Sequence, residues 1–554
     1  MGNDEIITFC SSQFSQIVRE SRMKLVFILV VCFHISDGKL RFASYYGDHM
    51  VLQKSPESAV LWGYGPEGVV ITVYLSGPTQ QQRSAEAAKD GIWRVSLDPV
   101  EAGGPYSVTA TCESSTATLT DVLFGDIWLC GGQSNMAFQT SRIFNSLEEL
   151  NLVAKYPDVR PFMVARDWSG TELTDIHYIR VKLPWSVPSS EVVAKFSAVC
   201  WLFGRYLHDT LKYPIGLIDS CWGGTPVEAW SSSRALQQCG LDYNDEFRRP
   251  YPSNKNSVLW NAMIHPLVKM TIKGAIWYQG ESNANYHQDK YNCSFPAMID
   301  DWRMAFHRGS GGNTAADFPF GFVQLSTYIK YSTDDSFPNI RWHQTADFGF
   351  APNLRMQKTF MAVAMDLPDE TSKGDAIHPR EKKAVAYRLT LGARAVAYNE
   401  TDVLFQGPFP SQILSTATYI NITYDQTLSV SPSTDTFQVC CSQIQAPCGP
   451  GSVWVAAPVG RWNPDSVQLS ISNLCSSAEE VMAIRYAWKD WPCSFKACPV
   501  YSASGILPAP PFIINRYAAP TTWKHSRLIL PISSFARSFI LHPSRSTQVK
   551  LDDV

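Results

Sequence analysis

The types and spacing of three residues, a serine, a histidine and an aspartate, predict acyl transfer. Ser134 follows the apolar run "IWLC" and two glycines in "GDIWLCGGQSNM". A serine hydroxyl attacks an ester only when a base removes its proton, and the base that we predict is His378 in "KGDAIHP". Asp375 stands three residues before this histidine, so we predict that its carboxylate accepts the imidazole Nδ1–H and fixes the tautomer. The pattern predicts a serine esterase that works through an acyl-enzyme.

Donors for the negative charge of the transition state follow two further strand-like runs. Gly223 stands in "LIDSCWGGTPVEAW" and Gln279 in "AIWYQGESNAN". We expect the backbone N–H groups of Ser134 and Gly223 and the side-chain amide of Gln279 to bind the substrate's oxyanion. Each motif alone also fits an ordinary turn, so the prediction depends on their joint occurrence at the ends of strands that meet at one sheet edge.

Other histidines and aspartates compete for these roles. His265 has apolar neighbours and is predicted to be a core residue, while His287 and His343 lack an acid in the same arrangement. Asp366 is the competitor of Asp375 for the orienting role, and a backbone carbonyl is the third alternative. The sequence has no H-E-x-x-H or comparable ligand spacing, so we predict no metal site.

The elements that must position these residues are predicted to form an α/β fold with accessory β domains. Residues 121–399 alternate apolar strand-like runs with helix-like segments, which indicates a parallel sheet flanked by helices and forms the predicted catalytic domain. Residues 39–120 show short alternating stretches between turns and are predicted to form an N-terminal β domain. Residues 400–515 form a C-terminal β-rich region, and residues 516–554 are predicted to be a disordered tail.

The N-terminus and the cysteines indicate the secretory pathway. Residues 1–38 are predicted to hold an upstream extension and a signal peptide that starts at Met23, because basic residues precede the apolar run "LVFILVVCF". Six of the 14 cysteines crowd between Cys440 and Cys498 without C-x-x-C pairs, which favours disulfides of unspecified connectivity over a zinc site. Glycosylation sequons at Asn292, Asn399 and Asn421 agree with this compartment. We therefore expect a lysosomal or secreted protein.

Composition limits the classes of partner. The net charge of −3 gives no broad basic surface, so nucleic acid is excluded as the expected partner, and the N-terminal apolar run is too short for a stable membrane span. Aromatic residues make up 12% of the chain, and we interpret most of them as core filling and some as possible platforms for sugar rings. The oligomeric state is left open.

Several motifs resemble a known family. "GQSNM", "SCWGGTPVEAW", "WYQGESNANY" and "IHPR" are similar to the blocks of the SGNH hydrolases, and longer stretches such as "FASYYGDHMVLQKSP" and "RYAWKDWPC" resemble the sialate O-acetylesterase family. The resemblance implies removal of O-acetyl groups from sialic acids, mainly at the 9-position, without a cofactor. It implies Ser134 as nucleophile, His378 as base and Gly223 as an oxyanion glycine.

The sequence departs from the family pattern at two places. The third block reads "YQGESN" where the superfamily has an asparagine, and "DAIHP" is longer than the D-I-H-P spacing of bacterial relatives. The alternatives to sialate deacetylation are an esterase for other acetylated carbohydrates and a carbohydrate-binding relative without activity.

Overall fold

The computed structural model describes residues 39–113, 115–177, 180–241, 251–443, 448–449, 451–515 and the backbone of 528–529. The predicted signal peptide and most of the predicted C-terminal tail lie outside these described residues. Within the tail, Leu528–Ile529 forms strand β25, which pairs with β15 (Pro410–Ser415).

A mostly parallel sheet forms the centre of the molecule, in the order β10-β9-β11-β8-β12-β13-β14. All neighbours in this order are parallel except β10, which runs antiparallel to β9. Its strands are β8 (Ser115–Gly132), β9 (Val159–Val164), β10 (Val181–Leu183), β11 (Ile215–Cys221), β12 (Gly274–Tyr278), β13 (Phe320–Gln324) and β14 (Thr359–Val363). Strands β11, β12 and β13 are buried along their whole length, which explains their continuous apolar sequences.

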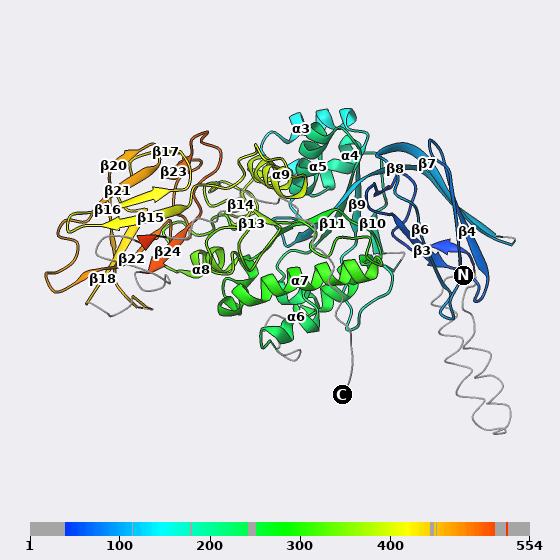
Figure 1. Ribbon diagram of the computed structural model, residues 1–554, viewed down its shortest axis with the longest axis horizontal. Helices are drawn as coiled ribbons and strands as arrows, with labels where there is room; N and C mark the ends of the chain where they lie inside the picture. The colour runs from blue at the N-terminus through cyan, green and yellow to red at the C-terminus, as the bar shows by residue number, and fades with distance from the viewer. Residues whose placement is uncertain are drawn as a thin grey trace, which may run out of the picture.

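Helices cover both faces of this sheet, as Figure 1 shows, with α3, α4, α5 and α9 on one side and α6 and α7 on the other. The predicted α/β class with a parallel sheet flanked by helices is confirmed. The helices are α3 (Ser146–Leu152), α4 (Ser190–Lys195), α5 (Ala198–Leu211), α6 (Ser233–Gln238), α7 (Tyr291–Gly309), α8 (Ser336–His343) and α9 (Lys382–Ala397). The Ser197 hydroxyl caps α5 by accepting the backbone N–H of Cys200 at 3.2 Å.

The N-terminal strands lie at one end of the molecule (Figure 1). They are β1 (Arg41–Phe42), β2 (Val51–Gln53), β3 (Val60–Tyr64), β4 (Val70–Ser76), β5 (Gln81–Glu86), β6 (Ile92–Ser96) and β7 (Gly103–Cys112). Strand β8 pairs with β7 through its first half and with β11 and β12 through its second half. The predicted boundary at residue 120 therefore falls inside one continuous strand, and we keep the division into domains as a proposal.

The C-terminal strands lie at the opposite end (Figure 1). Besides β15 they are β16 (Tyr419–Tyr424), β17 (Leu428–Val430), β18 (Phe437–Ser442), β19 (Trp454–Ala456), β20 (Val459–Asn463), β21 (Ser466–Ser470), β22 (Glu480–Tyr486), β23 (Val500–Ser502) and β24 (Phe512–Asn515). The buried Arg341 of α8 links this region to the end of β13. It donates to the carbonyls of Leu325 and Ser326, which follow β13, and to the carbonyls of Lys489 and Asp490 at 2.7 Å each.

Ten cysteines form five disulfides. The prediction that the C-terminal cysteines form disulfides is confirmed, and the structure gives the pairs as Cys440–Cys448, Cys441–Cys475 and Cys493–Cys498. Two more disulfides, Cys130–Cys200 and Cys239–Cys293, tie elements of the central domain together. Among the described residues Cys112 and Cys221 are free and buried. Five disulfides fit a protein of the secretory pathway.

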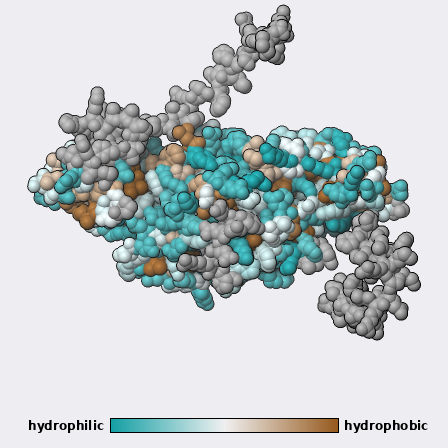
Figure 2. Space-filling view, turned by 90° about the horizontal axis from the view of Figure 1, so that it is seen from below, coloured by the Kyte–Doolittle hydropathy of each residue, from teal (hydrophilic) through white to brown (hydrophobic). Residues whose placement is uncertain are grey.

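Large apolar side chains fill the core, and the surface seen in Figure 2 is mostly hydrophilic. Trp128, Trp277 and Trp302 are among the fully buried tryptophans, as the core-filling interpretation expects. On the face shown in Figure 2, hydrophobic residues form small patches among hydrophilic ones. In the described part of the chain no helix is both long enough and apolar enough to cross a membrane.

Candidate active site

Ser134 stands on the turn that leaves the carboxyl end of β8. Gly132 has φ 134°, and a Cβ atom there would lie 2.2 Å from the backbone oxygen of Tyr278 on β12, so this position requires glycine. The backbone N–H of Gln133 donates to the same oxygen at 2.9 Å. The turn therefore holds Ser134 at the sheet edge, with its side chain half-buried.

Gly223, after β11, lies directly against the serine. A Cβ atom at Gly223 would be 3.2 Å from the Cβ of Ser134, and the backbone N–H of Trp222 donates to Gly132 at 3.0 Å. Neither the Ser134 N–H nor the Gly223 N–H is hydrogen-bonded to any described residue. Two unpaired N–H groups beside one hydroxyl are the arrangement that an oxyanion requires.

Gln279 does not fit the oxyanion role that we predicted for its side chain. Both hydrogens of its buried amide are used inside the protein, for the Thr225 carbonyl at 3.2 Å and the Asn283 side chain at 2.7 Å. Its amide oxygen accepts the hydroxyl of Tyr291 at 2.9 Å. The structure therefore makes Gln279 a support of the loop that follows β12.

His378 has the tautomer that a general base needs. Its Nδ1 lies 2.5 Å from the backbone oxygen of Gly374, and because a carbonyl only accepts, Nδ1 carries the proton. The other ring nitrogen, Nε2, therefore presents its lone pair. Burial lowers the pKa of His378, which keeps the ring neutral near pH 7.

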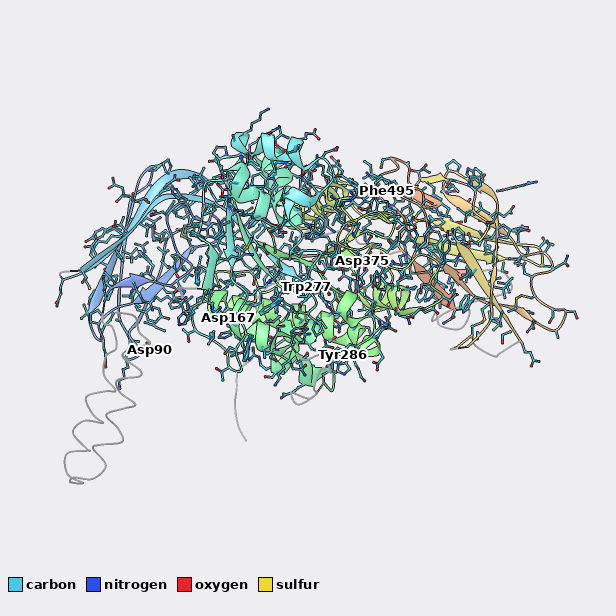
Figure 3. All side chains as sticks on the ribbon, turned by 180° about the vertical axis from the view of Figure 1, so that it is seen from behind. Asp90, Asp167, Trp277, Tyr286, Asp375 and Phe495 are labelled. Atoms are coloured by element: carbon cyan, nitrogen blue, oxygen red, sulfur yellow. A yellow bond between two sulfur atoms is a disulfide. The ribbon has the colours of Figure 1, made fainter. Side chains whose placement is uncertain are left out.

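The contact predicted between Asp375 and the His378 ring is not formed. Asp375 has φ 72°, and its carboxylate turns back to accept the backbone N–H of Ala376 at 2.8 Å. The third alternative, a backbone carbonyl, is the one that the structure shows: the carbonyl of Gly374 accepts the Nδ1–H of His378 and orients the ring. Figure 3 labels Asp375 near the middle of the molecule.

Asp366, the other candidate, is committed elsewhere. Its carboxylate accepts two hydrogen bonds from the guanidinium of Arg388, at 2.6 and 2.7 Å, and one from the Tyr501 hydroxyl at 3.0 Å. The backbone N–H of Lys496 donates to the Asp366 carbonyl at 2.7 Å. Asp366 thus joins the end of β14 to the C-terminal region.

A buried network that the sequence analysis missed connects the serine loop with the histidine loop. The amide of Asn135 donates to the Ile377 carbonyl at 2.8 Å and to the Glu281 carboxylate at 2.6 Å, and its oxygen accepts the Lys382 ammonium at 2.5 Å. Burial lowers the pKa of Lys382 to about 7 and raises the pKa of Glu281. The only sequence signal was the asparagine directly after Ser134.

The three other histidines considered have partners of their own. His265 Nδ1 donates to the Leu173 carbonyl at 2.9 Å, which gives it a structural contact. His343 Nδ1 lies 2.6 Å from Asp347, and His287 Nδ1 lies 3.3 Å from the buried Glu228. Across the described ranges, no cluster of three His, Cys, Asp or Glu side chains has the geometry to hold a metal ion.

Comparisons with known proteins cover most of this chain. Residues 124–394 match the family model described as a carbohydrate esterase, sialic acid-specific acetylesterase, and residues 411–516 match the sialate O-acetylesterase C-terminal domain. Curated relatives named sialate O-acetylesterase, from Homo sapiens and Pongo abelii, are each 50% identical over 494 residues, which cover 85% of this chain and 92% of each relative. The chain belongs to the sialate O-acetylesterase family. Its fold is shared with a carbohydrate acetylesterase from Xanthomonas citri. The crystal structure of that protein matches with a TM-score of 0.72 and 25% identity, and the match covers 86% of this chain and 100% of the Xanthomonas chain.

Membership in this family agrees with the resemblance seen in the sequence motifs. The identity extends well beyond the blocks around Ser134 and His378, because it covers 85% of the chain, and a second family model matches the C-terminal residues 411–516. The family is one of carbohydrate esterases, so the chemistry of this site is ester hydrolysis.

Proposed function

We propose that this chain removes O-acetyl groups from sialic acids, with Ser134 as nucleophile and His378 as general base. The observation that carries the proposal is the hydrogen bond from His378 Nδ1–H to the Gly374 carbonyl at 2.5 Å, since it leaves Nε2 unprotonated. The Asn135–Ile377 hydrogen bond joins the loop of this histidine to the loop of Ser134. The free N–H groups of Ser134 and Gly223 support the same reaction.

The reaction follows from these groups in two steps. His378 Nε2 takes the hydroxyl proton of Ser134 as Oγ attacks the acetyl carbonyl, and the oxyanion is bound by the N–H groups of Ser134 and Gly223. The bond to the sugar oxygen then breaks, and His378 gives its proton to that oxygen, which releases the sugar alcohol. In the second step water, deprotonated by His378, attacks the acetyl-serine and releases acetate and free Ser134.

We propose the 9-O-acetyl ester as the main substrate and the lysosome or the extracellular space as the place of action. The 9-oxygen is a primary alcohol at the end of the glycerol side chain, so its ester is the least hindered of the sialic acid hydroxyl esters. The five disulfides of the described residues support an oxidising compartment.

The test is acetate release by the purified full chain from 9-O-acetyl sialic acid and, in parallel, from acetylated xylose. We expect turnover of the sialic acid ester to exceed turnover of the xylose ester. Ser134→Ala should lower kcat by about 10³-fold or more, the scale of removing a nucleophile. Ser141→Ala, which removes an exposed hydroxyl, is the matched control. Equal turnover of both esters would contradict the substrate assignment, and an active Ser134→Ala variant would contradict the nucleophile.

A further inference from the structure

Arg142 lies beside the loop that carries the catalytic histidine. It ends the short 3₁₀ turn Thr140–Arg142, which follows the serine loop. A Cβ atom built on Gly374 would lie 2.8 Å from its Nη2 atom, so the guanidinium approaches the same residue whose carbonyl holds His378. The guanidinium also lies over the Phe138 ring, 4.8 Å from its centroid, and this contact restricts its position.

The charge of Arg142 has no counter-ion in the described part of the chain. Its exposed guanidinium makes no hydrogen bond or ion pair with any described side chain. Arg380, on the far side of His378 in the sequence, differs because its guanidinium is paired with Asp369 at 2.7 and 2.8 Å. Burial is the main cause of the lowered pKa of His378, and the positive charge of Arg142 adds to it. An unpaired guanidinium at this place is available for an anion brought by the substrate.

The direction of the reaction puts the sugar on the same side as Arg142. His378 gives its proton to the leaving oxygen, which belongs to the sugar, so the sugar lies on the histidine side of the acetyl carbon. The oxyanion lies on the other side, against Gly223, where a Cβ atom would lie 3.2 Å from the Cβ of Ser134. A sialic acid carries one carboxylate, C1, which is attached to the ring carbon C2, and neutral acetylated sugars carry none.

We propose that Arg142 binds the C1 carboxylate of the sialic acid and thereby sets the preference for acidic over neutral acetylated sugars. This inference rests on the proposed function. A planar guanidinium that is held on an aromatic ring matches a carboxylate with two parallel hydrogen bonds, which a lysine cannot reproduce. Binding at this point also places the acetyl end of the sugar toward Ser134.

Arg166 is the rival for this role. Its guanidinium lies 6.0 Å from the centroid of the Trp222 ring, next to Gly223, and it has no ion pair with a described carboxylate either. Its place is on the oxyanion side, where the acetyl group and not the sugar is expected. The two arginines therefore make different predictions about which variant loses recognition of the carboxylate.

The experiment compares two substrates that differ only in this charge, 9-O-acetyl sialic acid and its C1 carboxamide. The kcat/KM for acetate release is measured for both substrates with the wild type, Arg142→Gln, Arg142→Lys and Arg166→Gln. Arg461→Gln, which removes an exposed arginine of the C-terminal region, serves as the matched control. Thermal unfolding of every variant shows whether it is folded.

We expect the wild type to prefer the acid over the carboxamide by about 10- to 100-fold, the range of one bidentate charged pair. Arg142→Gln should remove most of this preference, mainly through KM, and Arg142→Lys should recover part of it. Arg461→Gln should keep the full preference.

Three results would overturn the inference while leaving the proposed function in place. Wild-type turnover without a preference for the acid would do so, as would an unchanged preference in Arg142→Gln or loss of the preference in Arg166→Gln alone. A folded wild type that does not hydrolyse either sialic acid ester would overturn the proposed function and the inference with it, so the two failures are distinguishable.

Discussion

Asn135 donates a hydrogen bond of 2.8 Å to the backbone carbonyl of Ile377. The two residues are the direct neighbours of Ser134 and His378 in the sequence, so one hydrogen bond fixes the loop of the proposed nucleophile to the loop of the proposed base. The amide of Asn135 is itself held from two sides, by the Glu281 carboxylate and the Lys382 ammonium. We interpret Asn135 as a positioning residue that sets the separation of the two reacting side chains.

Replacing Asn135 tests this interpretation. Asn135→Ala should lower kcat by about 10- to 100-fold, because an error of about 1 Å between reacting groups costs up to this much. KM should change little, and a fluorophosphonate probe should label Ser134 correspondingly more slowly. The variant should also lose about 1–3 kcal/mol of stability, since Lys382 and Glu281 lose a buried partner.

Asn353→Ala is the matched control for the loss of a buried amide. Asn353 donates to the carbonyls of Thr345 and Phe350 at 2.9 and 2.8 Å, outside the network of Asn135. It should lose similar stability with normal labelling of the serine. If both variants label at the wild-type rate, Asn135 has only a structural role.

Asp375→Asn should leave kcat within about threefold of the wild type, because Gly374 and not Asp375 accepts the Nδ1–H of His378. Asp366→Asn should instead lower stability, because Arg388 loses the charge of its buried partner. Steady-state kinetics and thermal unfolding of the two variants check both statements. A loss of 10² to 10⁴ in kcat for Asp375→Asn, the range found when a triad aspartate is replaced, would return the orienting role to Asp375.

The pH profile of kcat/KM tests the state of His378. The neutral ring is the active base, and it is present above the pKa of the ring. Because burial lowers this pKa, the acidic limb should lie below the ordinary histidine value of about 6.5, so activity should persist into mildly acidic solution. Rates measured between pH 4 and 8 locate this limb. A limb at or above pH 6.5 would show that the ring is not held neutral as the structure indicates.

The sequence predicted the sheet and its edge better than the hydrogen-bond partners of the candidate residues. Strand-like runs that end at Gly132, Gly223 and Gln279 were sufficient to infer a parallel sheet with its site at one edge, because apolar runs and glycine turns are local signals. The oxyanion role predicted for the side-chain amide of Gln279 was wrong. This amide donates to Thr225 and Asn283, which only folding brings next to it.

The orienting group of His378 was hard to predict for a related reason. A D-x-x-H spacing is visible in the sequence, whereas a backbone carbonyl such as that of Gly374 has no residue-type signal. The pairing of Cys441 with Cys475 and not with its neighbours likewise depends on strand register, which composition and spacing do not determine.

The C-terminal disulfides should differ in what they contribute to stability. Cys441–Cys475 closes a loop with a sequence separation of 34, and Cys440–Cys448 closes one of only 8. Restriction of the unfolded chain gives about 3.8 kcal/mol for the longer loop and about 2.5 kcal/mol for the shorter one. Replacing Cys441 and Cys475 together by serine should therefore lower the free energy of unfolding of the C-terminal region more than replacing Cys440 and Cys448 together.

The full chain is unfolded in denaturant, and proteolytic cleavage within the C-terminal region reports the unfolded fraction, which gives the loss of stability in each double variant. Peptide mapping without reduction verifies the disulfide pairs. Because Ser134 and His378 belong to other elements, acetate release at low denaturant should stay near the wild-type rate in both double variants. Equal losses of stability would show that native contacts, and not loop length, determine the effect. Free thiols at Cys441 and Cys475 in the wild type would contradict the pairing itself, and with it the oxidising compartment that the pairing supports.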